Sequence, residues 1–487
     1  MSPSSPEALY HPLPQAPVAA NPVLPSAPRL DSEDVDEADE SWPGQQREDH
    51  VTVDSRLWWI NCLLGIFCTD DLCLMLRVAA IITATPYFLS RLEGSPLQRT
   101  FSSYLSTSFT ASNFVFLAFA TVRSKQIFVT LIGLSVLSAL LSISTFIRAP
   151  PGAFFAFVIL NGVVQAAFGS FLQSSVIAVA SLFGPPAVQA LMSGQAAVAV
   201  AISIVQVISA AGSVWTHDDS LLLSDGTAEA RSAFVFFTLS ALYLLVVAGA
   251  HAWMVAQPVY RSVASALEPH RKADGTPDER HALVSAGPTE GSASAQIWRV
   301  ARSNVLYEIA VAYVFVVTLS VFPPITISVE PVNPSFHPLL FSAVHFLMFG
   351  LGDFIGRYML SYPRLVIWDA RRLLVLSLAR TLFVPLFLLC NIQTPSSDTL
   401  PSSPLINSDA LFMLLLFLFA MSNGFVSSSC MMAAPSLEHN ARLRGRKEDV
   451  DVAATVATFC LVGGLALGSI ASFVVRGAIC ACNPFAQ

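Results

Sequence analysis

Charged side chains are scarce in this sequence of 487 residues. Asp, Glu, Lys and Arg together make up 12% of the chain, whereas a soluble domain carries about 25%. Only Lys125, Lys272 and Lys447 are lysines, while 54% of the residues are apolar and the mean hydropathy is +0.61. A soluble particle of this size could not cover its surface with so few charges. The composition therefore predicts a protein with several membrane spans.

Several chemical signatures are also missing. The sequence has no Walker A loop, metal-ligand cluster, nucleophile elbow or pair of catalytic carboxylates, so neither an ATP-driven pump nor an enzyme is indicated. We expect no cofactor and no metal. A formal net charge of −7 without a basic face also argues against a nucleic-acid partner.

The negative charge is concentrated at the beginning of the chain. Residues 1–50 hold ten acidic and two basic residues, with nine of the 31 prolines. Such a segment buries too little apolar area to offset its ordering entropy, so residues 1–57 are predicted to be a disordered, acidic, Pro-rich cytosolic tail. Because no apolar run follows a basic start, we do not expect a cleavable signal peptide.

Eleven apolar windows follow that tail, each near the roughly 20 residues that a membrane-spanning helix needs. We predict spans near residues 58–90, 104–122, 127–147, 153–183, 187–213, 232–256, 304–327, 336–360, 365–391, 409–433 and 453–476. The predicted fold class is therefore all-α and polytopic. A six-helix half (58–256) and a five-helix half (303–487) flank a hydrophilic loop (257–302).

Basic residues predict the orientation of these spans. The even-numbered connections hold fifteen Lys and Arg residues and the odd-numbered ones hold four. Basic connections stay in the cytosol, so the N-terminus and the loops 257–302 and 434–450 are predicted to be cytosolic. The first span is the weakest of the eleven, because Asp70, Asp71 and Arg77 interrupt it.

Ionisable residues inside the bilayer are costly and are functional candidates by default. Asp353 and Arg357 share one helix face at i, i+4 spacing and can neutralise each other. They could contact a substrate or serve as a structural pair. Gly356 would let a neighbouring helix approach closely. His345, eight residues before Asp353, is either a hydrogen-bonded interior residue or a proton carrier.

A second polar feature lies in the fourth span, where Gln165, Gly169 and Gln173 recur every four residues. Amide side chains both donate and accept hydrogen bonds, so this stripe suits a polar neutral ligand; the alternative is interhelical hydrogen bonding. Arg380 in span nine and Asn423 in span ten complete the buried polar set. Glu308, near the beginning of span seven, is interpreted as facing water.

Five motifs in chain order resemble the equilibrative nucleoside transporter family over roughly residues 78–476. They are Leu172-Gln173 with Met192-Ser-Gly-Gln195, Thr318-Leu-Ser-Val-Phe-Pro-Pro-Ile325, Asp353-Phe-Ile-Gly-Arg357, Arg380 with Phe383-Val-Pro-Leu386, and Ser422-Asn-Gly424. The resemblance implies a bundle of 11 spans related to the major facilitator arrangement. Residues 68–77 depart from the family, which usually carries a Trp-Asn pair in the first span.

The resemblance also implies roles for individual residues. Gln173 would contact a nucleoside, Asp353 and Arg357 would bind it or support the site, and Gly169 and Gly194 would allow close packing. A fungal branch of the family includes vacuolar members, which favours a vacuolar or other internal membrane over the plasma membrane.

We therefore expect a carrier that moves nucleosides or nucleobases across a lipid bilayer by alternating access, either facilitative or linked to a coupling proton. One alternative is a non-transporting membrane sensor or scaffold with the same fold. The other is a carrier of a different small polar solute.

Overall fold

A computed structural model gives the fold of this chain. It describes residues 101–120, 127–147, 149–215, 227–257, 290–333, 336–391 and 405–480, together with Phe88, Arg91, Leu92, Ser95 and Tyr260. The predicted tail 1–57, the atypical segment 68–77 and nearly all of the first predicted span lie outside the described residues, as does most of the loop 257–302.

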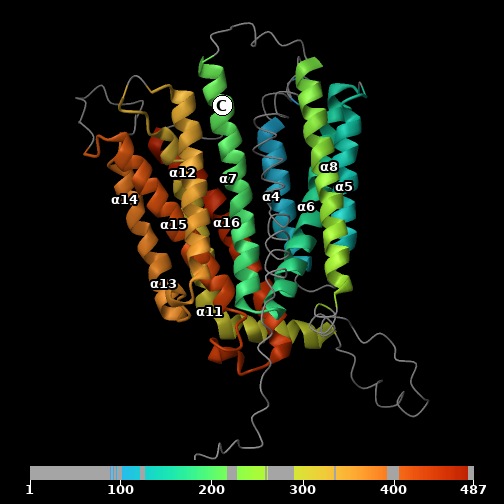
Figure 1. The fold of residues 1–487 in the computed structure, drawn as a ribbon, viewed down its shortest axis with the longest axis vertical. Coiled ribbons are helices and arrows are strands. Elements are labelled where there is room, and N and C mark those ends of the chain that lie inside the picture. Colours follow the sequence, from blue (N-terminus) through green and yellow to red (C-terminus); the bar gives the residue numbers. More distant parts are fainter. Residues whose placement is uncertain are drawn as a thin grey trace, which may run out of the picture. The chain divides into compact units, whose positions relative to one another are not determined.

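The described residues form long helices that run side by side (Figure 1). They are α4 (Phe101–Ala120), α5 (Ile127–Ser144), α6 (Pro151–Leu182), α7 (Pro185–Trp215), α8 (Thr227–Ala256), α11 (Glu290–Val321), α12 (Pro338–Tyr358), α13 (Ala370–Ala379), α14 (Phe383–Leu388), α15 (Asp409–Ala433) and α16 (Val450–Cys480). Eight of the described helices are long and apolar enough to cross a membrane. An all-helical membrane fold is thus confirmed, while the total of eleven spans and the side of the N-terminus remain predictions.

Local sequence explains where several of these helices begin and end. Gly184 separates α6 from α7 with a φ of +90°, a conformation that glycine adopts without strain, and α7 begins at Pro185. The Asp369 side chain caps α13 by accepting hydrogen bonds from the backbone N–H groups of Arg371 and Arg372. The ninth predicted span is not one uniform helix, because a 3₁₀ turn at Arg380–Leu382 joins α13 to α14.

The seventh predicted span differs most from its helix. We predicted residues 304–327, but α11 begins at Glu290, inside the predicted loop 257–302, and ends at Val321. Pro323 and Pro324 follow after one residue and cannot continue a helix, which explains the earlier end. The earlier beginning depends on tertiary contacts, because Val300 is buried in a small cluster with Leu443 and Ala453. Figure 1 shows this first part of α11 lying across one end of the bundle.

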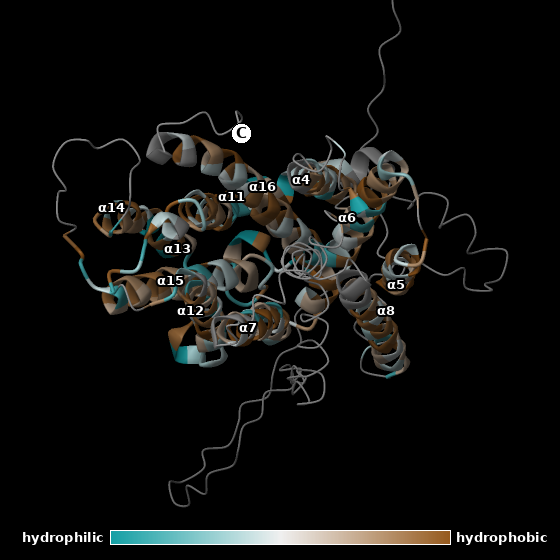
Figure 2. Ribbon diagram, turned by 90° about the horizontal axis from the view of Figure 1, so that it is seen from above, coloured by the Kyte–Doolittle hydropathy of each residue, from teal (hydrophilic) through white to brown (hydrophobic). Residues whose placement is uncertain are grey.

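Helix packing follows chain order only in part. In the predicted six-helix half, α5 packs along α8 and α4 along α6, but α7 packs mainly on α12 of the other half. Similarly, α16 of the predicted five-helix half contacts α6 and α4 of the six-helix half. Figure 2, viewed from above, shows α7 beside α12 and α16 beside α11. The crossing of α7 with α12 therefore joins the two halves, and the candidate site lies along it.

Candidate functional site

The centre of the candidate site is an ion pair on α12. The Nε atom of Arg357 donates to Oδ2 of Asp353 at 2.8 Å, and each side chain is only 11% exposed. The two residues are one helical turn apart, so the contact forms within α12. In a membrane-spanning helix this pairing lowers the cost of burying either charge.

The second carboxylate oxygen of Asp353 is bound from another helix. Asn423 of α15 donates from Nδ2 to Asp353 Oδ1 at 2.7 Å. The amide oxygen of Asn423 lies 2.7 Å from the hydroxyl of Thr318 on α11. A single buried amide thus joins three helices, using both its donor and its acceptor.

Arg380, immediately after α13, extends the same network. Its guanidinium donates from Nη2 to the Thr318 hydroxyl at 2.7 Å and from Nη1 to the Phe419 carbonyl at 3.1 Å, and it lies 4.6 Å from the Phe419 ring. The residue is 2% exposed. Among the described residues it forms no ion pair. Asp353 is therefore the one carboxylate in a network that holds two guanidinium groups.

Arg357 also reaches across to α7. Its Nη1 donates to the Met192 carbonyl at 3.2 Å and to Gln195 Oε1 at 3.4 Å. Nearer the beginning of α7, buried Gln189 donates to the Ser361 hydroxyl at 2.8 Å. These polar contacts connect the two halves of the bundle at Arg357 and at Ser361, one turn further along the chain.

Glycines allow α12 and α15 to come close enough for the Asn423–Asp353 hydrogen bond. A Cβ atom added at Gly356 would overlap the Met421 carbonyl oxygen of α15. One added at Gly424, next to Asn423, would overlap the Asp353 carbonyl oxygen of α12. Both positions therefore need a residue without a side chain.

The polar stripe of α6 does not act as one unit. Gln165 is buried and donates to Asn161 Oδ1 at 2.7 Å, and Asn161 in turn donates to the Leu137 carbonyl of α5. Gln173 is partly buried, and its Oε1 has no hydrogen-bond partner among the described residues. Gly169, between the two amides, is also partly buried. Within the described part of the chain, no hydrogen bond joins Gln165 or Gln173 to Asp353.

His345 lies on α12, two turns before Asp353, and is packed among aromatic rings. Its imidazole is stacked on Phe322 at 5.0 Å between ring centres and has Phe346 and Phe412 as further neighbours. It is 2% exposed, and neither ring nitrogen has a partner among the described residues. Two hydrogen-bonding positions are thus unused at this site.

The sequence prediction did not single out Gln189, Gln195 or Thr318 as site residues, although each is a polar residue inside an apolar run. Gly194, which was singled out, is buried on α7 beside Gln195. The interpretation that Glu308 faces water is wrong. This residue is 7% exposed, because α16 packs along α11, and its Oε1 is unpartnered within the described residues.

Comparison with known proteins places these features in context. The nucleoside transporter family model matches residues 159–477. Equilibrative nucleoside transporter 1 of Rattus norvegicus is 26% identical over 368 residues, which are 71% of this chain and 75% of the relative. Equilibrative nucleoside transporter 2 of Homo sapiens is 35% identical over 217 residues, 43% of this chain and 42% of the relative.

A yeast protein and a solved structure are also similar. Nucleoside transporter FUN26 of Saccharomyces cerevisiae is 26% identical over 343 residues, 66% of this chain and 64% of the relative. The crystal structure of the major facilitator superfamily transporter FucP in the outward conformation has a TM-score of 0.52 at 14% sequence identity. The match covers 88% of this chain and 93% of FucP, so the two proteins share a fold.

Proposed function

Because this chain belongs to the nucleoside transporter family and is a multi-pass membrane nucleoside transporter, we propose that it works by alternating access at the crossing of α7 with α12. The observation that carries the proposal is the set of hydrogen bonds from Arg357 of α12 to Met192 and Gln195 of α7. These bonds join the two halves of the bundle. They must break and re-form if the halves rock against each other around a bound solute.

The proposed substrate-binding residues are Gln173, Asp353, Arg357, Gln165 and Asn423, with Gly169, Gly194, Gly356 and Arg380 in packing or gating. Gln173 has the most direct support, because its partially buried side chain holds an oxygen with no partner among the described residues. A nucleoside is a neutral solute rich in hydroxyl and N–H donors. One of those donors would satisfy the unused amide oxygen.

Asp353 and Arg357 would act on the substrate through the same contacts that hold α7. The Arg357–Gln195 distance of 3.4 Å is long for a charge-assisted hydrogen bond. A substrate hydroxyl or base oxygen could replace Gln195 as the acceptor. Binding would then loosen one link between the halves, which couples occupancy to movement.

The coupling of transport and the range of substrates extend this proposal. We propose His345 as the proton-linked residue, since both its ring nitrogens are unpartnered among the described residues; facilitative transport is the alternative. Nucleobases are the second proposed substrate class. For the compartment, resemblance to the fungal branch of the family supports a vacuolar or other internal membrane, and microscopy of a tagged protein tests it.

Uptake into proteoliposomes tests the proposed function. Purified full-length protein should give saturable uptake of labelled uridine or adenosine that excess unlabelled nucleoside competes away. Empty liposomes are the first control, and labelled sugar and amino acid are the second. Absence of saturable nucleoside uptake, with sugar or amino acid uptake instead, would contradict the assignment. The sensor or scaffold alternative predicts no uptake of any of these solutes.

A further inference from the structure

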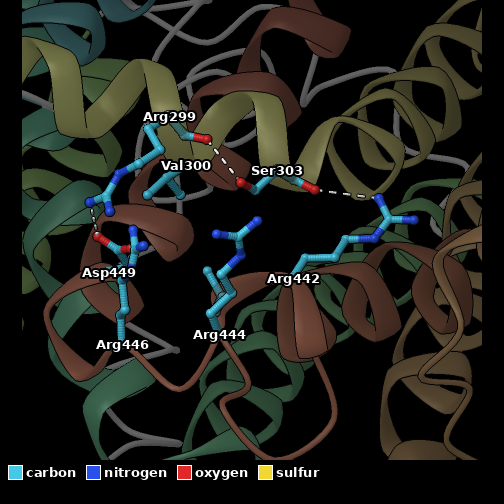
Figure 3. Close-up of a pocket in the computed structure, with 8 residues that line it drawn as sticks. Arg299, Val300, Ser303, Arg442, Arg444, Arg446 and Asp449 are labelled. Atoms are coloured by element: carbon cyan, nitrogen blue, oxygen red, sulfur yellow. Dashed lines mark hydrogen bonds and ion pairs between the residues drawn. The ribbon is translucent and has the colours of Figure 1, made fainter.

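A basic cavity of about 450 Å³ lies outside the polar network described above. It is formed between the first part of α11 and two 3₁₀ turns, η9 (Ala441–Leu443) and η10 (Lys447–Asp449), that precede α16. We call it the arginine cradle. Its lining residues, which are drawn in Figure 3, are Arg299, Val300, Ser303, Arg442, Leu443, Arg444, Arg446 and Asp449.

The arginine cradle contains four guanidinium groups and one carboxylate, and that carboxylate is already engaged. Asp449 accepts hydrogen bonds at 2.9 Å from Arg299 and at 3.0 Å from Gln296, and Arg446 lies 3.9 Å from its other oxygen. Among the described residues, Arg442 donates to a backbone carbonyl, that of Ser303, at 3.4 Å, lies 6.0 Å from the Tyr307 ring and forms no ion pair. The positive charge of the cradle is therefore not balanced by its own acids.

Of the four arginines, Arg444 has the fewest polar partners among the described residues. Its guanidinium has no hydrogen bond or ion pair with the part of the chain that the structure describes, and Figure 3 shows it pointing into the cavity between Arg446 and Arg442. Its backbone has a φ of +53°, in the left-handed region that residues with side chains rarely adopt. An arginine here is unfavourable for the backbone, and its exposed side chain forms no hydrogen bond or ion pair within the described protein, a combination that favours a functional role for the position.

The turn that presents Arg444 is firmly held. Asn440, 2% exposed, donates to the Ala434 carbonyl at 2.8 Å and to Asn304 Oδ1 at 2.9 Å. Leu443 is buried against Val300 of α11. The arginines therefore project from a fixed backbone, so little ordering of the backbone is needed when an anion binds.

We propose that the arginine cradle binds a phosphate ester. The planar guanidinium matches phosphate oxygens with two parallel N–H donors, and several such groups around one cavity suit a group with more than one negative charge. The volume is within the range of small-molecule sites, so it admits a phosphate together with the group that carries it. The phosphate ester has two sources, the headgroup of an anionic phospholipid and a soluble nucleotide. The proposal does not depend on the transport assignment.

Binding measurements on the purified full-length protein in detergent test the proposal and distinguish the sources. The lipid probes are dioctanoyl phosphatidylinositol 4-phosphate and, as the zwitterionic control, dioctanoyl phosphatidylcholine. The soluble probe is AMP, measured in the presence of saturating adenosine, because adenosine is a proposed transport substrate and occupies the transport site without supplying a phosphate. We expect at least one phosphate probe to bind and to raise the thermal unfolding temperature. Binding of the inositol lipid alone assigns a headgroup site, and binding of AMP assigns a soluble ligand.

Variants connect binding to the arginine cradle. Arg444→Gln should weaken binding about ten-fold or more, since it removes a charge-assisted contact. Arg444→Gly should lose binding equally while keeping or raising the unfolding temperature without ligand, because glycine tolerates the left-handed backbone. Arg302→Gln is the matched control. Arg302 is exposed on α11, 5.9 Å from the Trp298 ring, and does not line the cavity.

Two outcomes would overturn the proposal. One is the absence of binding of every phosphate probe to the wild-type protein at millimolar concentration. The other is phosphate binding that Arg444→Gln and Arg444→Gly leave at the wild-type affinity, or that Arg302→Gln weakens as much as they do. Either result would make the arginine cradle a solvated surface feature.

Discussion

Asn423 of α15 donates a hydrogen bond to Asp353 of α12 at 2.7 Å, on the carboxylate oxygen that Arg357 does not use. Both oxygens of Asp353 are thus occupied, one within its own helix and one from a neighbour. Through Asn423 and Thr318 the same carboxylate is connected to Arg380. Asp353 is therefore the shared counter-charge of Arg357 and Arg380. Loss of Asp353 should consequently cost more stability than loss of Arg357.

The first prediction concerns that inequality. Removing one partner of a buried ion pair costs about 3–5 kcal/mol, because the other charge is left unpaired. Asp353→Asn leaves two guanidinium groups without a carboxylate, whereas Arg357→Gln leaves Asp353 with Asn423 and the nearby Arg380. We expect Asp353→Asn to lower the abundance of folded protein more than Arg357→Gln does, as measured by fluorescence-detected size-exclusion chromatography.

The double variant separates folding from transport. Asp353→Asn with Arg357→Gln should recover only part of the abundance, since Arg380 still lacks a counter-charge. Recovery without uptake would support contact of the pair with substrate or a role in gating. Recovery of both would assign the pair to structure, and two silent single variants would contradict its burial.

A second prediction concerns the two amides of α6. Gln173→Leu removes an amide whose oxygen has no partner among the described residues, so protein abundance should stay normal. If the amide binds the nucleoside, leaving a polar group of the substrate unpaired costs about 1–3 kcal/mol, and affinity should fall roughly 5- to 150-fold. Competition by unlabelled nucleoside measures the affinity.

Gln165→Leu is the matched comparison on the same helix. Gln165 donates to Asn161 at 2.7 Å, so its loss should lower the thermal unfolding temperature, whatever its effect on transport. Unchanged affinity in Gln173→Leu would assign that residue to packing and remove it from the proposed substrate site.

The third prediction concerns the approach of α12 to α15. Gly356→Ala places a methyl group against the Met421 carbonyl oxygen and should cost about 1–3 kcal/mol through overpacking. The added separation should also weaken the Asn423–Asp353 bond and lower uptake. Gly249→Ala on α8 is the control, because its Cβ meets nothing within 4 Å. Equal thermal unfolding temperatures for the two variants would show that the helices separate without cost.

His345 supplies a test of coupling. We expect His345→Phe to keep normal abundance, because the ring sits among Phe322, Phe346 and Phe412, and to lose any acceleration of uptake by an inward proton gradient. Uptake is compared with and without a gradient in proteoliposomes. A gradient response retained in the variant would make His345 a packing residue. If the proton gradient does not change the uptake rate of the wild-type protein, transport is facilitative.

Sequence reasoning succeeded where the physical cause is local. Long apolar windows predict spans because a helix in lipid must satisfy every backbone polar group within itself. The windows at 127–147 and 409–433 accordingly match α5 and α15 within three residues at each end. The Asp353–Arg357 contact could also be predicted, since i, i+4 spacing on one helix already places the two side chains next to each other.

Reasoning of this kind failed where a distant segment decides the outcome. The beginning of α11 at Glu290 depends on burial of Val300 against Leu443, which is 143 residues away in the chain. Glu308 lies near the beginning of the seventh predicted span, and the packing of α16 along α11 removes it from solvent. Likewise, Gln165 and Gln173 share a helical spacing but not an environment.

The sequence by itself determined that this chain is a helical membrane protein, and it placed Asp353, Arg380 and Asn423 inside apolar segments that the structure shows to be helical and buried. Only the tertiary structure decided how those residues combine. Asn423 meets Asp353 across 70 residues and Thr318 across 105, and α7 pairs with α12 rather than with its neighbours in the chain. The physical reason is that apolar lipid does not distinguish one apolar helix from another. Partners are therefore chosen by glycine contacts and buried hydrogen bonds that exist only after the helices have packed.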